Sequence, residues 1–190
     1  MSLLTPMLRS SPLTDWFSDA QRVQGMLDFE AALAQAQAAC GMVPPEAVGP
    51  IVAACRHEAI DFAALGEAAV GAGNLAIPLV KQLTAQVKTR NPEAARYIHW
   101  GATSQDAIDT GLVLQLRGAL DAAETLLEQL LAALALQADR YRDTVMPGRT
   151  WMQHALPVTF GLKLAGTVAA RVRWQQRLGE MRPRLRGLPV

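Results

Sequence analysis

The sequence lacks the features that mark several common protein classes. Its 190 residues include only 2 cysteines, and neither Cys40 nor Cys55 lies in a Cys-x-x-Cys pair or a Cys/His cluster. This argues against a disulfide scaffold and against a zinc site. Lysine and arginine total 18 while aspartate and glutamate total 17, for a net charge of +1. That balance offers no basic surface to nucleic acid or to an anionic membrane.

Long hydrophobic runs are missing as well. No apolar run reaches the roughly 20 residues that a bilayer-spanning helix requires. The N-terminus lacks the apolar core and the small-residue cleavage site of a secretory signal. The GxxxxGK[ST] pattern of a phosphate-binding loop is also absent. We therefore expect a cytoplasmic protein that binds neither membrane nor nucleic acid.

Segments with the alternating pattern of a β-strand are almost absent, and apolar residues instead recur at helical spacing. We expect an all-α fold, with an N-terminal helical domain over residues 1–110 and the first part of a long-helix bundle over residues 111–190. The predicted helices cover residues 18–39, 44–51, a segment capped by Asp61, 111–145 and 157–182.

The helix predicted over 111–145 has a wider apolar face than one neighbour can cover. Apolar side chains recur along it at alternating spacings of four and three, as in a bundle, and further leucines flank this seam. Such a face must be enclosed by several other helices. We expect identical chains and the rest of a longer polypeptide to provide them. The seam residues are Leu112, Leu116, Ala119, Ala123, Leu126, Leu130, Ala133 and Gln137.

Polar side chains cluster just before this long helix, in "YIHWGATSQDAIDTG" (residues 97–111). One interpretation is helix capping, since Thr103, Ser104 and Asp106 are all good N-cap residues. One cap needs a single side chain, however, and this segment also supplies His99 and Gln105. Hydroxyls and free N–H groups at a helix start form a site for a carboxylate or phosphate. The spacing alone leaves both interpretations open.

A second polar stretch, "GRTWMQHALPVTFG", covers residues 148–161. It is either a polar connection between two helices, with Trp151 covering apolar surface, or part of a ligand site. A third, "GAGNLAIPLVKQL" over residues 71–83, places Asn74 in a glycine-rich turn. Turn formation explains Asn74, and a polar ligand contact is the alternative. The candidate binding residues of the second stretch are Arg149, Thr150, Trp151, Gln153 and His154.

Two of these stretches resemble the first two signature regions of the fumarase/aspartase superfamily: "HWGATSQDAIDTGLVLQL" and "GRTWMQHALPVTFGLKLAG". The segments "FSDAQRVQGMLDFEAALAQAQAACGMVP" and "GNLAIPLVKQL" resemble its bacterial 3-carboxy-cis,cis-muconate cycloisomerase branch. The resemblance implies an all-α homotetramer with active sites built from three subunits. Members are more than twice as long and carry a third signature, a loop with a serine, that is missing here. The chain is therefore expected to be the N-terminal part of such an enzyme.

The resemblance also implies a reason for the tryptophan at position 151. Lyases of the superfamily read G-R-T-H at this point, and their histidine is the candidate acid for the leaving group, a task that an indole N–H cannot perform. Lactonisation has no leaving group in the forward direction, because a substrate carboxylate adds to a carbon–carbon double bond. The expected reaction converts 3-carboxy-cis,cis-muconate, a tricarboxylate, to 4-carboxymuconolactone in the β-ketoadipate pathway of aromatic catabolism.

The resemblance assigns roles to particular residues and implies no metal or organic cofactor. His154, His99 or the missing loop serine delivers the proton. An adenylosuccinate-type lyase and a non-catalytic helical oligomerisation fragment are the alternative functions. The expected substrate-binding residues are Thr103, Ser104, Gln105, Arg149, Thr150, Trp151, Gln153 and Asn74.

Overall fold

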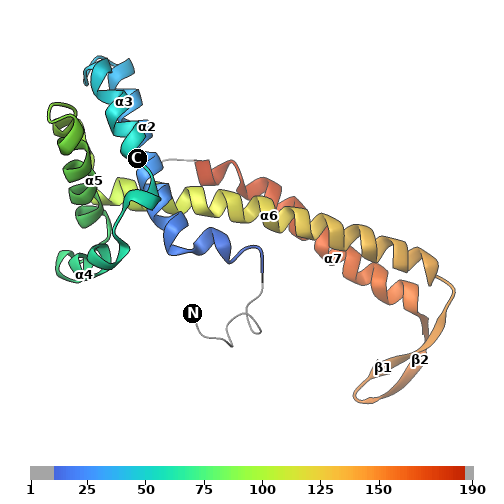
Figure 1. Ribbon diagram of the computed structural model, residues 1–190. Helices are drawn as coiled ribbons and strands as arrows, with labels where there is room; N and C mark the ends of the chain where they lie inside the picture. Colours follow the sequence, from blue (N-terminus) through green and yellow to red (C-terminus); the bar gives the residue numbers. More distant parts are fainter. Residues whose placement is uncertain (1–10, 187–190) are drawn as a thin grey trace. The chain divides into compact units, whose positions relative to one another are not determined.

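The computed structural model describes residues 11–186, and Figure 1 shows its helices and its one hairpin. It divides into two compact units, Met1–Gly118 and Ala119–Val190. The sequence-based division at residues 110 and 111 stays a prediction. Residues 1–10, on which part of the argument against a secretory signal rests, lie outside the described residues.

The first unit is helical, and the predicted helix ends are confirmed where capping chemistry marked them. The Ser18 hydroxyl accepts a hydrogen bond from the Gln21 N–H at the start of the first long helix, and Asp61 caps α4 through the Ala64 N–H. Gly41, just past the first long helix, has a φ of 73°, which suits glycine. The elements are η1 (Asp15–Phe17), α2 (Asp19–Ala39), α3 (Pro45–Ala54), η2 (His57–Ala59), α4 (Phe62–Ala72), α5 (Ala76–Arg90) and η3 (Ala94–Tyr97).

An apolar core holds this unit together. Each large aliphatic side chain that is removed from water contributes about 1.5–3 kcal/mol, and α2, α3, α4 and α5 all contribute to the core. The largest fully buried side chains are Leu27, Ile51, Leu65, Leu79, Leu83, Val43 and Val87.

Helix α6 (Ser104–Arg140) starts about two turns before the predicted residue 111. The prediction was wrong there because it counted only apolar periodicity and passed over the polar first turns. Where α6 meets α2, Gly111 faces Gly25: a Cβ added to Gly25 would lie 2.8 Å from the Gly111 carbonyl oxygen. The two backbones therefore approach more closely than any side chain would permit.

The second unit contains the C-terminal part of α6, strands β1 (Val145–Thr150) and β2 (Gln153–Thr159), helix α7 (Phe160–Met181) and η4 (Arg184–Arg186). Helix α7 runs back along α6 (Figure 1). The Arg182 guanidinium binds Asp121 at 2.6 Å and Glu124 at 2.5 Å. No described helix is long and apolar enough to cross a membrane.

The hairpin corrects two predictions. Residues 145–159 were expected to be helix and irregular loop, yet they form an antiparallel pair of strands. Helix α7 begins at Phe160 rather than Pro157, and the Thr159 hydroxyl accepts the Leu162 N–H as its cap. Pro157 lies within β2 instead. The fold is otherwise helical throughout the described chain, as predicted.

We predict that Gly25→Ala destabilises the chain by about 1–3 kcal/mol, because the new methyl group meets backbone that cannot move aside. Gly49→Ala is the matched control, since a Cβ at Gly49 has no neighbour within 4 Å and alanine favours helix by up to about 1 kcal/mol. Urea unfolding of both variants measures the difference. Equal stability of the two variants would contradict the close helix crossing.

Candidate active site

The turn that leads into α6 is held by two buried polar side chains of α2. His99 has a φ of 57° and Gly101 a φ of 70°. The Nδ1 atom of His99 lies 2.6 Å from Glu30 Oε1, and Gln37 Nε2 donates to the Trp100 carbonyl oxygen at 2.6 Å. Together these contacts fix the backbone and one ring of the turn.

Glu30 is an unusual residue for the inside of a helical domain. Its side chain is 2% exposed, and burial raises the pKa of its carboxyl while the contact with His99 opposes that rise. Its second oxygen, Oε2, has no hydrogen-bond partner among the described residues. Glu30 and Gln37 were not among the predicted site residues. The sequence offered one signal for them, which is their spacing. Val23, Glu30 and Gln37 follow one another at two helical turns along α2, and all three are buried.

The first turn of α6 explains part of the polar cluster by capping. The Thr103 hydroxyl accepts the Gln105 N–H at 3.1 Å, and Asp106 accepts the Thr103 N–H at 2.8 Å, a reciprocal capping arrangement. Gln105 Nε2 donates to Asp109 at 2.6 Å. The half-buried Ser104 hydroxyl has no hydrogen-bond partner within residues 11–186. Ser104 is therefore the side chain of this turn that is free to bind a ligand.

Asn74 caps the start of α5, because its Oδ1 accepts the Ile77 N–H at 3.1 Å. The predicted turn role is thereby confirmed. Asn74 also lines a cavity of about 300 Å³ beside Arg22 and Gln115. Gln115 is occupied by a hydrogen bond to the Trp16 carbonyl oxygen at 2.8 Å.

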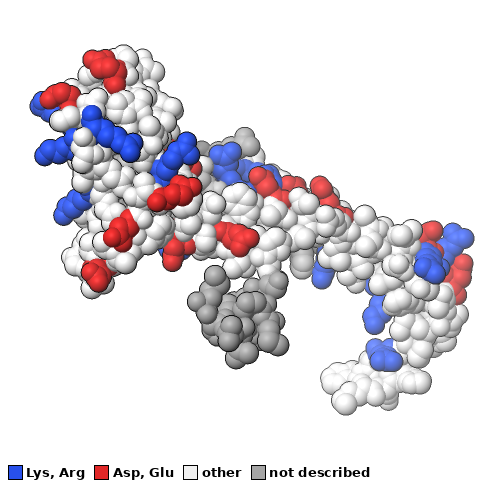
Figure 2. Space-filling model, viewed as in Figure 1, with Lys and Arg blue, Asp and Glu red and all other residues white. Residues whose placement is uncertain are grey.

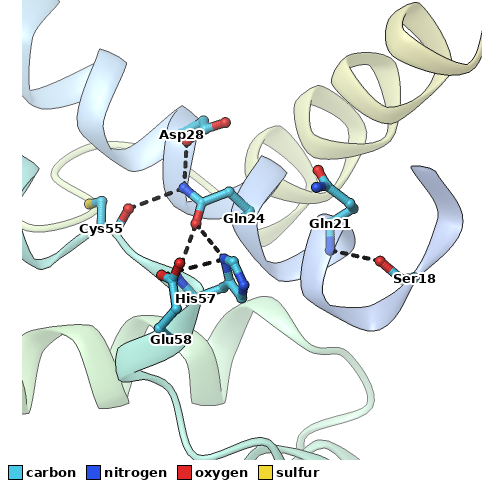
Figure 3. A network of polar contacts seen from close by, with 7 residues as sticks. All are labelled: Ser18, Gln21, Gln24, Asp28, Cys55, His57 and Glu58. Carbon is cyan, nitrogen blue, oxygen red and sulfur yellow. Dashed lines mark hydrogen bonds and ion pairs between the residues drawn. The ribbon is translucent and has the colours of Figure 1, made fainter. Parts of the chain in front are cut away.

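The remaining histidine of the chain, His57, belongs to a structural network (Figure 3). Gln24 Oε1 accepts the His57 backbone N–H at 2.9 Å and lies 3.1 Å from His57 Nδ1. The amide nitrogen of Gln24 donates to Asp28 Oδ1 and to the Cys55 carbonyl oxygen. This network ties the segment around η2 to α2. His57 is not among the predicted site residues.

The hairpin arranges the second set of candidate residues on two faces. Arg149 pairs with His154, and Thr150 pairs with Gln153. Directly opposed residues share a face and successive residues alternate, so Arg149 and His154 lie on one face. All four are exposed. A carboxylate bound by Arg149 would thus lie beside the His154 ring.

The tip of the hairpin has an unusual backbone. Trp151 and Met152 form its two-residue turn with φ values of 46° and 59°, where glycine or asparagine is usual. Trp151 is 92% exposed, so it does not cover apolar surface of this chain, as one interpretation had it. Figure 2 shows the end of the hairpin as mostly uncharged surface. Positive φ at bulky residues concentrates at functional sites.

The candidate residues are thus divided between the two units. Asn74, His99, Thr103, Ser104 and Gln105 lie in the first, and the hairpin residues lie in the second. The turn before α6 carries His99, Thr103, Ser104 and Gln105, and the hairpin brings Arg149 beside His154, whereas Asn74 lies at the start of α5.

Comparison with known proteins decides the family. A family described as "Lyase" matches residues 8–190. The chain belongs to this lyase family, part of the fumarase/aspartase superfamily. It is 59% identical, over 93% of its length, to the 3-carboxy-cis,cis-muconate cycloisomerase of Pseudomonas aeruginosa, of which it covers 38%. It is 43% identical, over 86% of its length, to the nitrosuccinate lyase of Streptomyces davaonensis, of which it covers 35%.

A solved structure agrees with this membership. The crystal structure of a 3-carboxy-cis,cis-muconate lactonizing enzyme from Pseudomonas putida matches 97% of the chain with a TM-score of 0.95 and 55% identity, and the chain covers 42% of it. The lyase-family chain therefore spans about two fifths of the length of these cycloisomerase relatives.

We predict that Met152→Gly stabilises the hairpin of this lyase-family chain, by up to about 1 kcal/mol, because glycine adopts positive φ without steric cost. Amide hydrogen exchange across β1 and β2 measures this as increased protection. Leu156→Gly is the control: Leu156 is also exposed, at 84%, but it lies in extended β2, where glycine should lower protection. Lower protection in both variants would mean that the turn is not strained.

Proposed function

We propose that the intact protein containing this chain is a 3-carboxy-cis,cis-muconate cycloisomerase, which forms 4-carboxymuconolactone in the β-ketoadipate pathway. The observation that carries the proposal is the 59% identity, over 93% of the chain, to an enzyme of that name. The positions of Ser104, Arg149 and His154 are consistent with the chemistry.

The reaction is an isomerisation within one substrate molecule. A carboxylate oxygen of the substrate adds to one carbon of a double bond, and the protein delivers a proton to the neighbouring carbon. Water then reprotonates the proton donor, so the substrate gains one proton and loses no atom. Negative charge grows on a substrate carboxylate beside that carbon as the new bond forms. Preorganised donors stabilise such charge effectively. We assign this role to Ser104 and to Arg149.

The other predicted residues support binding in this proposal. Thr103 shapes the first turn through its cap, and Gln105, Thr150, Gln153 and Asn74 place amides and a hydroxyl where carboxylates can reach them. Trp151 supplies an uncharged surface at the tip. Because an indole N–H does not transfer protons near neutral pH, a tryptophan here suits a reaction without a leaving group.

For proton delivery we propose His154, with His99 as the second candidate. His154 shares a hairpin face with Arg149, so a carboxylate on the guanidinium would bring the substrate to the imidazole. An ordinary histidine pKa of about 6.5 suits proton transfer near neutral pH. The serine of the third signature, which this chain does not contain, is a further contender.

We also propose that the intact protein is a cytoplasmic homotetramer. Leu126 and Leu130 on α6 are 42% and 46% exposed, and Leu162 on α7 is 63% exposed. Exposed apolar surface of this extent usually marks an interface. Copies of the chain together with its missing part would cover it.

The proposed function is tested by assaying the full-length protein with 3-carboxy-cis,cis-muconate and, separately, with adenylosuccinate. We expect lactone formation from the first substrate and no cleavage of the second. Cleavage of adenylosuccinate alone would assign the protein to the alternative lyase activity. If neither substrate reacts and neither raises the melting temperature, the helical oligomerisation alternative is supported.

Two substitutions in the full-length enzyme separate binding from proton delivery. We expect Ser104→Ala chiefly to raise KM, because Ser104 holds a carboxylate of the bound substrate. His154→Asn should lower kcat by about 10²–10⁴-fold with a smaller change in KM, since a group that acts only in the transition state affects kcat. A His154→Asn enzyme with nearly normal kcat would move proton delivery to His99 or to the serine loop.

A further inference from the structure

Helix α2 places two buried polar side chains against the same turn, and they differ in a way that sequence pattern does not explain. Gln37 is a neutral amide that donates to the Trp100 carbonyl oxygen at 2.6 Å. Glu30 lies two helical turns earlier on the same helix and carries an ionisable carboxyl to within 2.6 Å of His99 Nδ1. Both are inside the unit, at 8% and 2% exposed.

A purely structural contact to His99 does not require a carboxyl group. Burying a carboxylate costs several kcal/mol even when it is partnered, whereas an amide of the same size could accept the same N–H hydrogen bond at lower cost. The neighbouring ionisable groups do not offset the charge. Burial raises the pKa of the Cys55 thiol to about 12, and the negative charges of Glu30 and Asp28 add to the rise. Within residues 11–186, His99 is the one group that can offset the Glu30 charge with a positive charge.

The geometry of His99 restricts what its ring can do. The backbone is held at a φ of 57°, a region that histidine tolerates better than most residues but that still costs free energy. The side chain is 17% exposed, so most of the ring is enclosed. With Nδ1 occupied by Glu30, Nε2 is the ring nitrogen left for a ligand. This turn leads directly to Thr103 and Ser104.

We propose that Glu30 is a positioning residue of the active site: its carboxylate accepts the Nδ1–H of His99, fixes the ring orientation and tautomer, and leaves Nε2, once it is protonated, to donate to a substrate carboxylate beside Ser104. The inference rests on the proposed function for its catalytic consequence, but the tautomer itself is a property of this chain. A carboxylate that orients an active histidine through Nδ1 is a widespread arrangement. It also accounts for an acidic residue among the buried residues of α2.

The first test uses ¹⁵N-histidine spectra of the full-length protein at alkaline pH, where imidazole is neutral. Signals are assigned by substituting His57, His99 and His154 one at a time. We expect wild-type His99 to carry its proton on Nδ1, against the Nε2–H preference of free imidazole. Glu30→Met should return His99 to the Nε2–H form. Gln37→Met is the matched control, which loosens the same turn and should leave the His99 tautomer unchanged.

Two outcomes would overturn the proposal: an Nε2–H tautomer of His99 in the wild-type chain, or an Nδ1–H tautomer that persists in Glu30→Met. If Glu30→Met does not fold, Glu30→Gln keeps the size of the side chain and removes its charge. We then expect the Nδ1 signal of His99 to shift or broaden as the Nε2–H form gains population. An unchanged Nδ1 signal in a folded Glu30→Gln chain would likewise refute the role of the carboxylate.

The second test uses kinetics of the full-length enzyme. Glu30→Gln should lower kcat by about tenfold or more with little change in KM, as for other partners that orient an active histidine. Combined with His99→Asn, it should cause no further loss, because the two residues act as one unit. Additive losses would indicate a purely structural Glu30. A full-length protein without lactonising activity would refute the proposed function, whereas the tautomer measurement would still decide the role of Glu30.

Discussion

The contact between α2 and the turn before α6 is the constraint on which the candidate site depends. Three residues of α2 make this contact. Gly25 permits the close approach of Gly111, Glu30 lies against His99 Nδ1, and Gln37 donates to the Trp100 carbonyl oxygen. Apolar burial could hold the helices together, but it is non-directional. The two polar contacts specify the backbone of one turn, and through it the start of α6.

At the start of α6, the residues that cap the helix differ from the residue that is free to bind a ligand. The Asp106 carboxylate accepts the Thr103 N–H, the Thr103 hydroxyl accepts the Gln105 N–H, and the Gln105 side chain donates to Asp109. The first turn is therefore already rigid before any ligand arrives, and Ser104 is left with its hydroxyl free. A site of this kind needs little reorganisation to receive a carboxylate, which favours binding of charge that develops during a reaction.

Much of the helical fold could be predicted from the sequence, because caps and periodicity are local. Ser18, Asp61 and Gly41 mark helix ends by chemistry that acts within a few residues. The hairpin could not be predicted in the same way. Residues 151–157 are exposed on both faces, so no buried face imposes the alternation by which strands are recognised. Pro157 then suggested a helix start where the chain is extended.

The motifs of the candidate site could be predicted from the sequence, but the buried side chains that hold those motifs in place could not. The polar clusters identified Ser104, Arg149 and His154 because several polar side chains gather there without a full structural explanation. Glu30 gave no such signal on its own, since it is one acid in a long amphipathic helix, and its partner lies 69 residues away. Only the tertiary fold reveals that pairing. The pairing of Arg149 with His154 similarly depends on the hairpin register.

The most direct test of the account is the structure of the intact protein with a bound, unreactive tricarboxylate analogue of the proposed substrate. We predict one carboxylate within hydrogen-bonding distance of the Ser104 hydroxyl, near His99 Nε2, and another on the Arg149 guanidinium of the same or a neighbouring subunit. An analogue bound away from both motifs, for example in the hollow lined by Arg56 and Arg90, would contradict the account.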